Sequence, residues 1–154
     1  MPLHAAVRKE SSRRLNLARY ERAVLKILKK TGWTNAIVSI LLTTDSKIRK
    51  TNKRFLGHDY ATDVISFGHN AKLKKQKGKE PVFIGDLVIS LDTAAAECIE
   101  YGNAFSYEVL FYTVHGILHC MGYEDDTPEK SALMLRKQTL ILKQTGFDRY
   151  SLVN

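Results

Sequence analysis

Two histidines near residue 120 form the pattern in this sequence with the clearest chemical meaning. His115 and His119 are four residues apart, and on a helix that spacing places them one turn apart on the same face. Two imidazoles arranged in this way can bind one zinc ion, at about 2.0–2.1 Å per nitrogen. Apolar residues recur around them at helical spacing, which predicts a helix that ends before Gly122.

Gly122 and the acidic residues after it supply a possible third ligand. A glycine directly after a helix can adopt positive φ and turn the chain back toward the face that it has left. Asp125 follows three residues later, and a carboxylate oxygen is an acceptable zinc ligand. We therefore predict that His115, His119 and Asp125 bind one Zn²⁺ ion, with Asp126 as the second choice for the third ligand. Three protein ligands leave one position open for water, as in catalytic zinc sites.

Other interpretations of these residues stay open at this point. Paired histidines on a helix are often buried and only complete hydrogen bonds. Cys120 points about 100° away from the adjacent histidine, so we interpret it, like Cys98, as a small buried apolar residue. The remaining histidines, His4, His58 and His69, lie outside the group. His69 follows a predicted strand and could line a cleft, although an ordinary surface position is the preferred interpretation.

The residue directly after the first histidine helps to distinguish between classes of zinc hydrolase. Zinc peptidases with the motif His-Glu-x-x-His carry their general base directly after the first histidine. Here that residue is Gly116, which argues against a peptidase and makes it the third hypothesis. Glu124 and Asp126 are the nearest candidates for a base, and a hydroxyl group of the substrate itself is an alternative nucleophile. The catalytic residues are therefore left unassigned.

Composition indicates one domain and an acidic partner. The 154 residues, 44% of them hydrophobic, suffice for a single domain spanning 1–154 with its own core. Lysine and arginine total 24 against 16 acidic residues, a net charge of +8, which favours nucleic acid over a membrane as partner. A well-solvated basic surface is the alternative. Two cysteines and no apolar stretch of about 20 residues predict a cytoplasmic protein without a membrane span.

The helices and strands that must position the site alternate in the first half of the chain, whereas the second half is predicted to be helical. Apolar periodicity and capping residues predict five helices and three strands. The helices are expected at 17–31, from Asp45 or Ser46 to 55 or 56, at 91–101, from Ser106 to 121 and at 127–145, and the strands at 36–42, 63–67 and 82–90. The expected N-caps of the last four helices are Asp45 or Ser46, Ser90, Ser106 and Thr127, and Gly57, Gly102 and Gly122 are expected to end the second, third and fourth helices. This order predicts an α+β fold, in which a small mixed β-sheet packs with about five helices and the metal site lies on a helix of the C-terminal half.

Gly85 and Asp86 interrupt the third predicted strand. A glycine inside a strand marks a bulge or a close approach of another backbone, and Asp86 could then face a cleft. The alternative is a kink in an edge strand with a solvated acid.

Basic and aromatic residues provide candidate nucleic-acid contacts. We predict nucleic-acid binding by Arg54 and by three lysines of the loop between 70 and 81, namely Lys72, Lys74 and Lys75. The alternative for this loop is a solvated segment without a ligand. Tyr60, Tyr123 and Phe67 could stack on bases, although a core position is the preferred interpretation for Phe67.

Several sequence blocks together resemble the YbeY family of endoribonucleases, the bacterial and organellar rRNA maturation factors. Residues 115–123, His-Gly-Ile-Leu-His-Cys-Met-Gly-Tyr, are similar to the family motif His-Gly-x-Leu-His-x-x-Gly-Tyr-Asp-His. Residues 62–67 resemble its Thr-Asn/Asp-Val-Leu-Ser-Phe strand, and residues 84–90 resemble its Leu-Gly-Asp-Ile-Val-Ile-Ser block. Asn52, Phe55, Gly57 and Asp59 match the pattern Asn-x-x-Tyr/Phe-x-Gly-x-Asp. The resemblance covers roughly residues 35–145.

The resemblance implies a zinc-dependent endoribonuclease that prefers single strands and acts on rRNA and ribosomal particles in rRNA maturation and ribosome quality control. Two departures stand out. Asp125 occupies the place of the usual third histidine, and a carboxylate there lowers the net charge of the site and makes bound water less acidic. Leu56 stands where many members carry an arginine thought to serve the active site. The alternative function is a non-catalytic RNA-binding ribosome-assembly factor with a structural metal.

Overall fold

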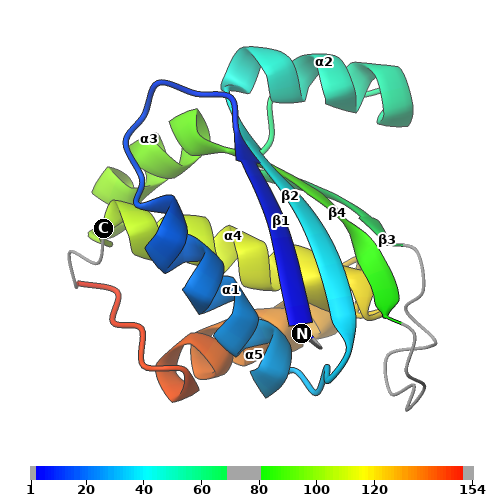
Figure 1. Cartoon of the computed structure of the whole chain (residues 1–154). Helices are drawn as coiled ribbons and strands as arrows, with labels where there is room; N and C mark the ends of the chain where they lie inside the picture. Colours follow the sequence, from blue (N-terminus) through cyan, green and yellow to red (C-terminus); the bar gives the residue numbers. More distant parts are fainter. Residues whose placement is uncertain (1–2, 69–80, 151–154) are drawn as a thin grey trace.

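A four-stranded mixed sheet forms the centre of the structure (Figure 1). The structure is a computed structural model that describes residues 3–68 and 81–150. The strands are β1 (Leu3–Lys9), β2 (Ala36–Thr43), β3 (Val64–Gly68) and β4 (Val82–Ser90), in the spatial order β1-β2-β4-β3. The first three in this order are parallel, and β3 pairs antiparallel with β4. The predicted α+β class with a small mixed sheet is confirmed.

The edge strand β1 was not among the predicted strands. It pairs with β2 along its whole length, from Leu3 opposite Ala36 to Lys9 opposite Leu42. Of its seven residues only Ala5 is fully buried. This edge strand has only a short apolar run, Ala5-Ala6-Val7, so hydrophobic patterning has little signal to detect.

Five helices surround the sheet in the described ranges, as the sequence predicted. They are α1 (Leu17–Lys30), α2 (Asp45–Leu56), α3 (Leu91–Tyr101), α4 (Phe105–Cys120) and α5 (Pro128–Gln144). Ser90 and Thr127 cap α3 and α5 as expected. The expected caps of α2 and α4 were wrong. Thr44 caps α2 because its side chain accepts from the Lys47 amide, and Ala104 precedes α4 without a side-chain cap.

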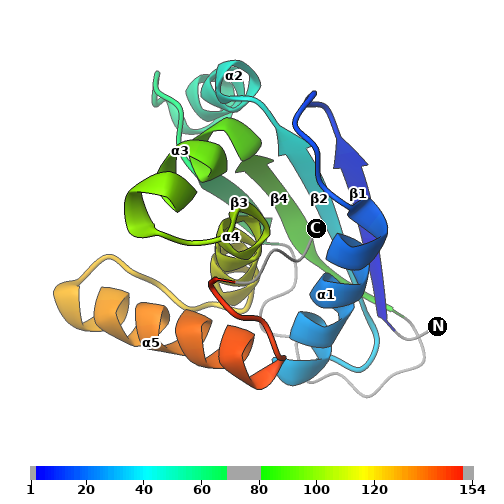
Figure 2. The same cartoon turned by 90° about the vertical axis from the view of Figure 1, so that its left-hand side faces the viewer.

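Helix α4 is the central helix of the fold. Figure 2 shows it between the sheet and α5, with α1 and α3 on the same side of the sheet. Twelve of its 16 residues are buried, so apolar packing on several sides fixes its position. Helix α2 packs on the opposite face, where Ile48 meets Ile65 and Val88 in a second, smaller apolar cluster. No helix in the described part of the chain is both long enough and apolar enough to cross a bilayer.

The glycine of β4 allows α4 to approach the sheet closely. The register of β4 shifts at this point, because Ile37 pairs with Phe83 whereas Val38 pairs with Gly85. A Cβ on Gly85 would lie 2.5 Å from Cys120 Sγ and 2.7 Å from the Phe67 carbonyl oxygen. Both predicted meanings of this glycine, a bulge and a close approach, are thus confirmed. The edge-strand interpretation is wrong, since β4 lies between β2 and β3.

Candidate metal centre

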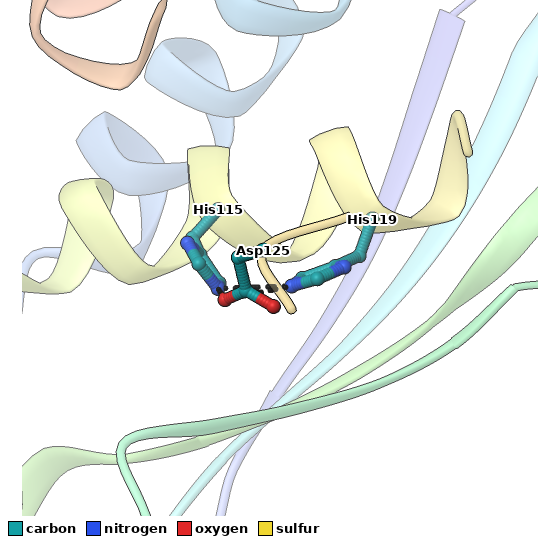
Figure 3. A group of neighbouring side chains, drawn as sticks. All are labelled: His115, His119 and Asp125. Carbon is teal, nitrogen blue, oxygen red and sulfur yellow. Dashed lines mark hydrogen bonds and ion pairs between the residues drawn. The ribbon is translucent and has the colours of Figure 1, made fainter. Parts of the chain in front are cut away.

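The two histidines and the aspartate of the predicted ligand set converge on one point (Figure 3). His115 and His119 project from successive turns of α4, and their Nε2 atoms are 3.0 Å apart. Asp125 Oδ2 lies 3.3 Å from Nε2 of His115 and 3.5 Å from Nε2 of His119. Each side chain is partly accessible, which leaves the cluster open on one side.

These distances match the size of a zinc coordination sphere. Ligand atoms at about 2.0–2.1 Å from a tetrahedral ion are separated from one another by about 3.3–3.4 Å. The three separations in this cluster are 3.0, 3.3 and 3.5 Å. Two imidazole nitrogens and one carboxylate oxygen are also a ligand set that zinc accepts. The residues therefore fit a zinc ion with one open coordination position.

A tight turn after α4 brings the carboxylate back to the histidines. Gly122 has a φ of 98°, a conformation that glycine adopts without strain. Its amide donates to the His119 carbonyl at 2.9 Å, and the Tyr123 amide donates to the Leu118 carbonyl at 3.0 Å. The predicted role of Gly122 is confirmed. These two hydrogen bonds close the end of the helix and reverse the chain before Asp125.

The neighbouring acids Glu124 and Asp126 point to a different partner. Both lie close to the Lys130 ammonium group, at 3.0 and 3.3 Å, and they are largely exposed. Asp126, the second choice for the third ligand, is therefore not part of the cluster. Both acids pair with Lys130 of α5 instead.

Gln138 of α5 completes the surroundings of the cluster, and the sequence interpretation missed it. It is 3% exposed, its Nε2 donates to the Phe111 carbonyl at 3.2 Å, and its Oε1 lies 3.1 Å from His115 Nδ1. Because the amide nitrogen already donates to Phe111, Oε1 is the atom that can accept from Nδ1–H. That hydrogen bond places the proton on Nδ1 and leaves the Nε2 lone pair for a metal. The sequence did contain a signal for this residue: Gln138 lies four residues from both Met134 and Leu142, on the face of α5 that is buried.

The cluster opens into a pocket of about 350 Å³, the metal-site pocket. Its walls come from the C-terminal end of α2, the segment between α2 and β3, β3 itself and the three candidate ligands. Leu56, at the place of the family arginine, lies in this wall, and so do His58 and Tyr60. Among the described lining residues there is no lysine or arginine. His58 thus lies outside the ligand group, as predicted, but shares its pocket.

Of the predicted RNA-binding residues, Arg54 lies in the described part of the chain, and it does not line this pocket. Arg54 is exposed on α2 and places its guanidinium 5.3 Å from the centre of the Phe55 ring. Lys72, Lys74, Lys75 and His69 lie outside the described residues.

The remaining candidate residues behave largely as packing groups. Cys120 is 1% exposed, and burial together with the nearby Asp86 carboxylate raises the pKa of its thiol to about 12. Cys98 is also buried and free. Phe67 packs on the second cluster and meets Phe55 edge-on at 5.8 Å. Tyr123 packs against the main core, with the Lys137 ammonium 5.1 Å from its ring centre.

Comparisons with known proteins agree with the sequence motifs. The family profile described as "Endoribonuclease YbeY" matches residues 6–146. A protein named endoribonuclease YbeY from Desulforamulus reducens is 37% identical over 137 residues, which cover 87% of this chain and 90% of that protein. The protein of the same name from Syntrophus aciditrophicus is 34% identical and covers 90% of this chain and 87% of its own length.

A solved structure supports the fold. The solution structure of a Thermotoga maritima protein superimposes with a TM-score of 0.65 at 23% identity, covering 92% of this chain and 88% of that one. The profile match spans most of the chain, and the curated relatives match over nearly their full length. The chain belongs to the endoribonuclease YbeY family.

Proposed function

We propose that this protein is a zinc-dependent endoribonuclease that cleaves RNA at the site formed by His115, His119 and Asp125. The observation that carries the proposal is the convergence of three ligand atoms, all within 4.8 Å of one another, at a pocket open to solvent. Membership in a family of endoribonucleases supports RNA as the substrate. The family resemblance also supports a preference for single strands and a role in rRNA maturation and ribosome quality control, on rRNA within ribosomal particles.

Each residue of the site would have a separate role in the proposed reaction. Zinc in this position would polarise a phosphoryl oxygen and lower the pKa of water. His115 and His119 are fixed by their places on a buried helix, and Gln138 orients the imidazole of His115. The partly exposed Asp125 closes the third side of the cluster and leaves the side that faces the pocket to substrate. This arrangement supports a site whose three ligands would be in place before substrate arrives, which would reduce reorganisation during the reaction.

We also propose that the chain acts as one catalytic domain. The main apolar core includes residues from β1 through α5, so the ends of the described chain contribute to the same interior. The net charge of +8 supports binding of a polyanion by that domain.

A non-catalytic RNA-binding assembly factor is the second candidate function. Leu56 favours it, because an apolar side chain stands in the pocket wall, at the position where the family resemblance places an arginine. Without that charge, stabilisation of a developing phosphorane charge would rest on the metal and on backbone or neutral groups. In this alternative the metal would hold the turn after α4 in place and RNA would bind without being cut.

Peptidase activity receives no support from the geometry. A Cβ on Gly116 would lie 2.6 Å from Leu87 Cδ2, so a side chain at this position would collide with β4. The glutamate base of the zinc peptidase motif therefore cannot be accommodated next to His115 without repacking.

Cleavage assays distinguish the two candidate functions. We expect purified protein loaded with zinc to cut single-stranded RNA, and we expect a chelator or the change His115→Ala to abolish cutting. His4→Ala, which alters an exposed histidine on β1, serves as the matched control and should cut at the wild-type rate. RNA binding without metal-dependent cleavage would favour the assembly factor, and turnover of a casein substrate would favour a peptidase.

A further inference from the structure

Two pockets of the structure share one wall. The first is the metal-site pocket, and the second is a hollow of about 650 Å³ beside α2, the α2 pocket, whose lining includes Arg49, Lys50 and Lys53. Tyr60 lines both pockets. A nucleic-acid strand that occupies both pockets can therefore contact this tyrosine in each of them.

The shared wall carries an exposed aromatic surface. Tyr60 is 55% exposed, and its ring lies parallel to the ring of His58, with centroids 5.4 Å apart and an interplanar angle of 10°. The Tyr60 hydroxyl also lies 3.2 Å from His58 Nδ1. Exposed aromatic rings of this kind are the usual platforms on which unpaired bases stack.

The segment that carries the two rings is fixed by contacts that do not involve the ring of Tyr60. Asn52, which is 2% exposed, donates from Nδ2 to the Tyr60 carbonyl at 3.0 Å. Asp59 accepts from Arg49 Nε at 2.8 Å. Gly57 ends α2 with a φ of 74° and directs the chain into this segment. The platform is therefore set in place before a ligand arrives, and its aromatic ring is left available.

The α2 pocket offers positive charge to a phosphate chain. Arg49 and Lys53 lie near one carboxylate, that of Asp59, at 2.8 and 3.8 Å. Lys50 adds a third cation to the lining. The other acid of the pocket, Asp45, already accepts from the hydroxyls of Ser90 and Thr93. Cations on one side and ring surface next to them are the combination that binds single-stranded nucleic acid.

We propose that Tyr60, backed by the stacked ring of His58, is a base-stacking platform that guides an unpaired RNA strand from the basic α2 pocket into the metal-site pocket. This inference rests on the proposed endoribonuclease function and adds a substrate-binding role for residues outside the metal cluster. A base on the platform belongs to a nucleotide near the scissile phosphate, because the same ring borders the pocket of the candidate ligands. A base-paired nucleotide cannot offer its face in this way, so the platform selects unpaired RNA.

The test compares three tyrosine variants of the full-length, zinc-loaded protein. Tyr60→Ala should lower kcat/KM for a single-stranded oligonucleotide about five- to a hundredfold. Tyr60→Phe, which keeps the ring, should stay within about twofold of the wild type. Tyr101→Ala is the matched control, because Tyr101 is 54% exposed and its carbonyl likewise accepts a hydrogen bond at 3.0 Å, from Arg149. The control should cut at the wild-type rate.

Two further measurements separate stacking from a general loss of structure. With the same sequence in a duplex, Tyr60→Ala should change cleavage little, so its preference for single strands should fall. Lys50→Ala should reduce the dependence of KM on salt by roughly one unit of the log–log slope, whereas Tyr60→Ala should leave that slope unchanged.

The outcomes distinguish this proposal from the proposed function. If wild type cuts RNA and Tyr60→Ala is as active and as selective as wild type, the platform is refuted while the nuclease stands. If Tyr60→Phe loses as much activity as Tyr60→Ala, the hydroxyl is what matters and stacking is refuted. If wild type loaded with zinc cuts no RNA, the proposed function itself fails.

Discussion

At the scale of single residues, the site depends on one hydrogen bond that connects two helices. Gln138 reaches from α5 to His115 on α4 and is held by the Phe111 carbonyl. Groups in this position commonly change metal affinity by 10- to 100-fold when they are removed. The amide thus couples the packing of α5 to the chemistry of a histidine 23 residues away in sequence.

Gln138→Leu should therefore weaken zinc binding about 10- to 100-fold. The apolar side chain fills similar space but cannot accept from Nδ1–H of His115, so the imidazole loses its preferred tautomer. Competition with a chromophoric chelator measures the affinity. Gln144→Leu, an exposed change near the end of the same helix, is the control and should leave the affinity unchanged. Equal affinities for wild type and Gln138→Leu would contradict this role.

The two adjacent aspartates should differ sharply when each is removed. Asp125→Ala should cost most of the zinc affinity, because one of three ligand atoms is lost. Asp126→Ala should cost little, because Asp126 faces Lys130. Asp125→His, which restores the usual family ligand, should bind zinc. Metal content after dialysis reports all three variants, and a larger loss from Asp126→Ala than from Asp125→Ala would reverse the assignment.

At the scale of helices and strands, the position of the site depends on how closely α4 approaches β4. Gly85→Ala places a methyl group 2.5 Å from Cys120 Sγ and 2.7 Å from the Phe67 carbonyl oxygen. The second contact is with backbone, so it cannot be relieved by rotating a side chain. We expect a loss of about 1–3 kcal/mol in the free energy of unfolding, measured by urea denaturation. An unchanged urea midpoint would contradict this expectation, because it would show that β4 can move away from Cys120 and Phe67 without loss of stability.

The start of α2 is tied to α3 by Asp92, and this contact should give a pH-dependent stability. Its carboxylate accepts from the Asp45 amide at 2.9 Å and from Arg13 Nε at 2.8 Å, which lowers the pKa of Asp92. Because the native pKa is the lower one, this stabilisation is complete at neutral pH and is lost as pH falls through the native pKa.

Asp92→Asn should thus lower the free energy of unfolding by about 1 kcal/mol at pH 7. The difference from wild type should shrink as pH falls below about 4, where the carboxylate of the unfolded chain is protonated. Urea titrations across this range measure it. Glu100→Gln, an exposed change on the same helix, is the control. A difference that grows toward acid pH would contradict the assigned sign.

The elements also show what the sequence could and could not predict. Helix ends marked by Gly57, Gly102 and Gly122 were found because left-handed glycines have a local signal. Strand β1 was not predicted, because its pairing with β2, and not its own burial, makes it a strand. The ligands could be predicted since helical spacing and one turn bring them together. Gln138 could not, because its contact with His115 depends on how α5 packs against α4.

At the scale of the whole molecule, the fold places positive charge and the candidate metal centre on neighbouring surfaces. Helix α2 lies on one side of the sheet (Figure 1). It presents exposed lysines and arginines, and residues near its C-terminal end line the metal-site pocket. The overall charge of +8 favours encounter with a polyanion. In the proposed function, the local arrangement would then determine which phosphate of the RNA strand reaches the metal centre.

The central claim is that His115, His119 and Asp125 together hold one metal ion, and X-ray absorption spectroscopy on purified protein with metal analysis tests it most directly. We predict one zinc per chain, bound by two imidazole nitrogens at about 2.0–2.1 Å and by oxygen ligands. His119→Ala should reduce the zinc content several-fold. A protein that retains no metal, or one whose metal content and imidazole signal are the same in His119→Ala, would contradict the account.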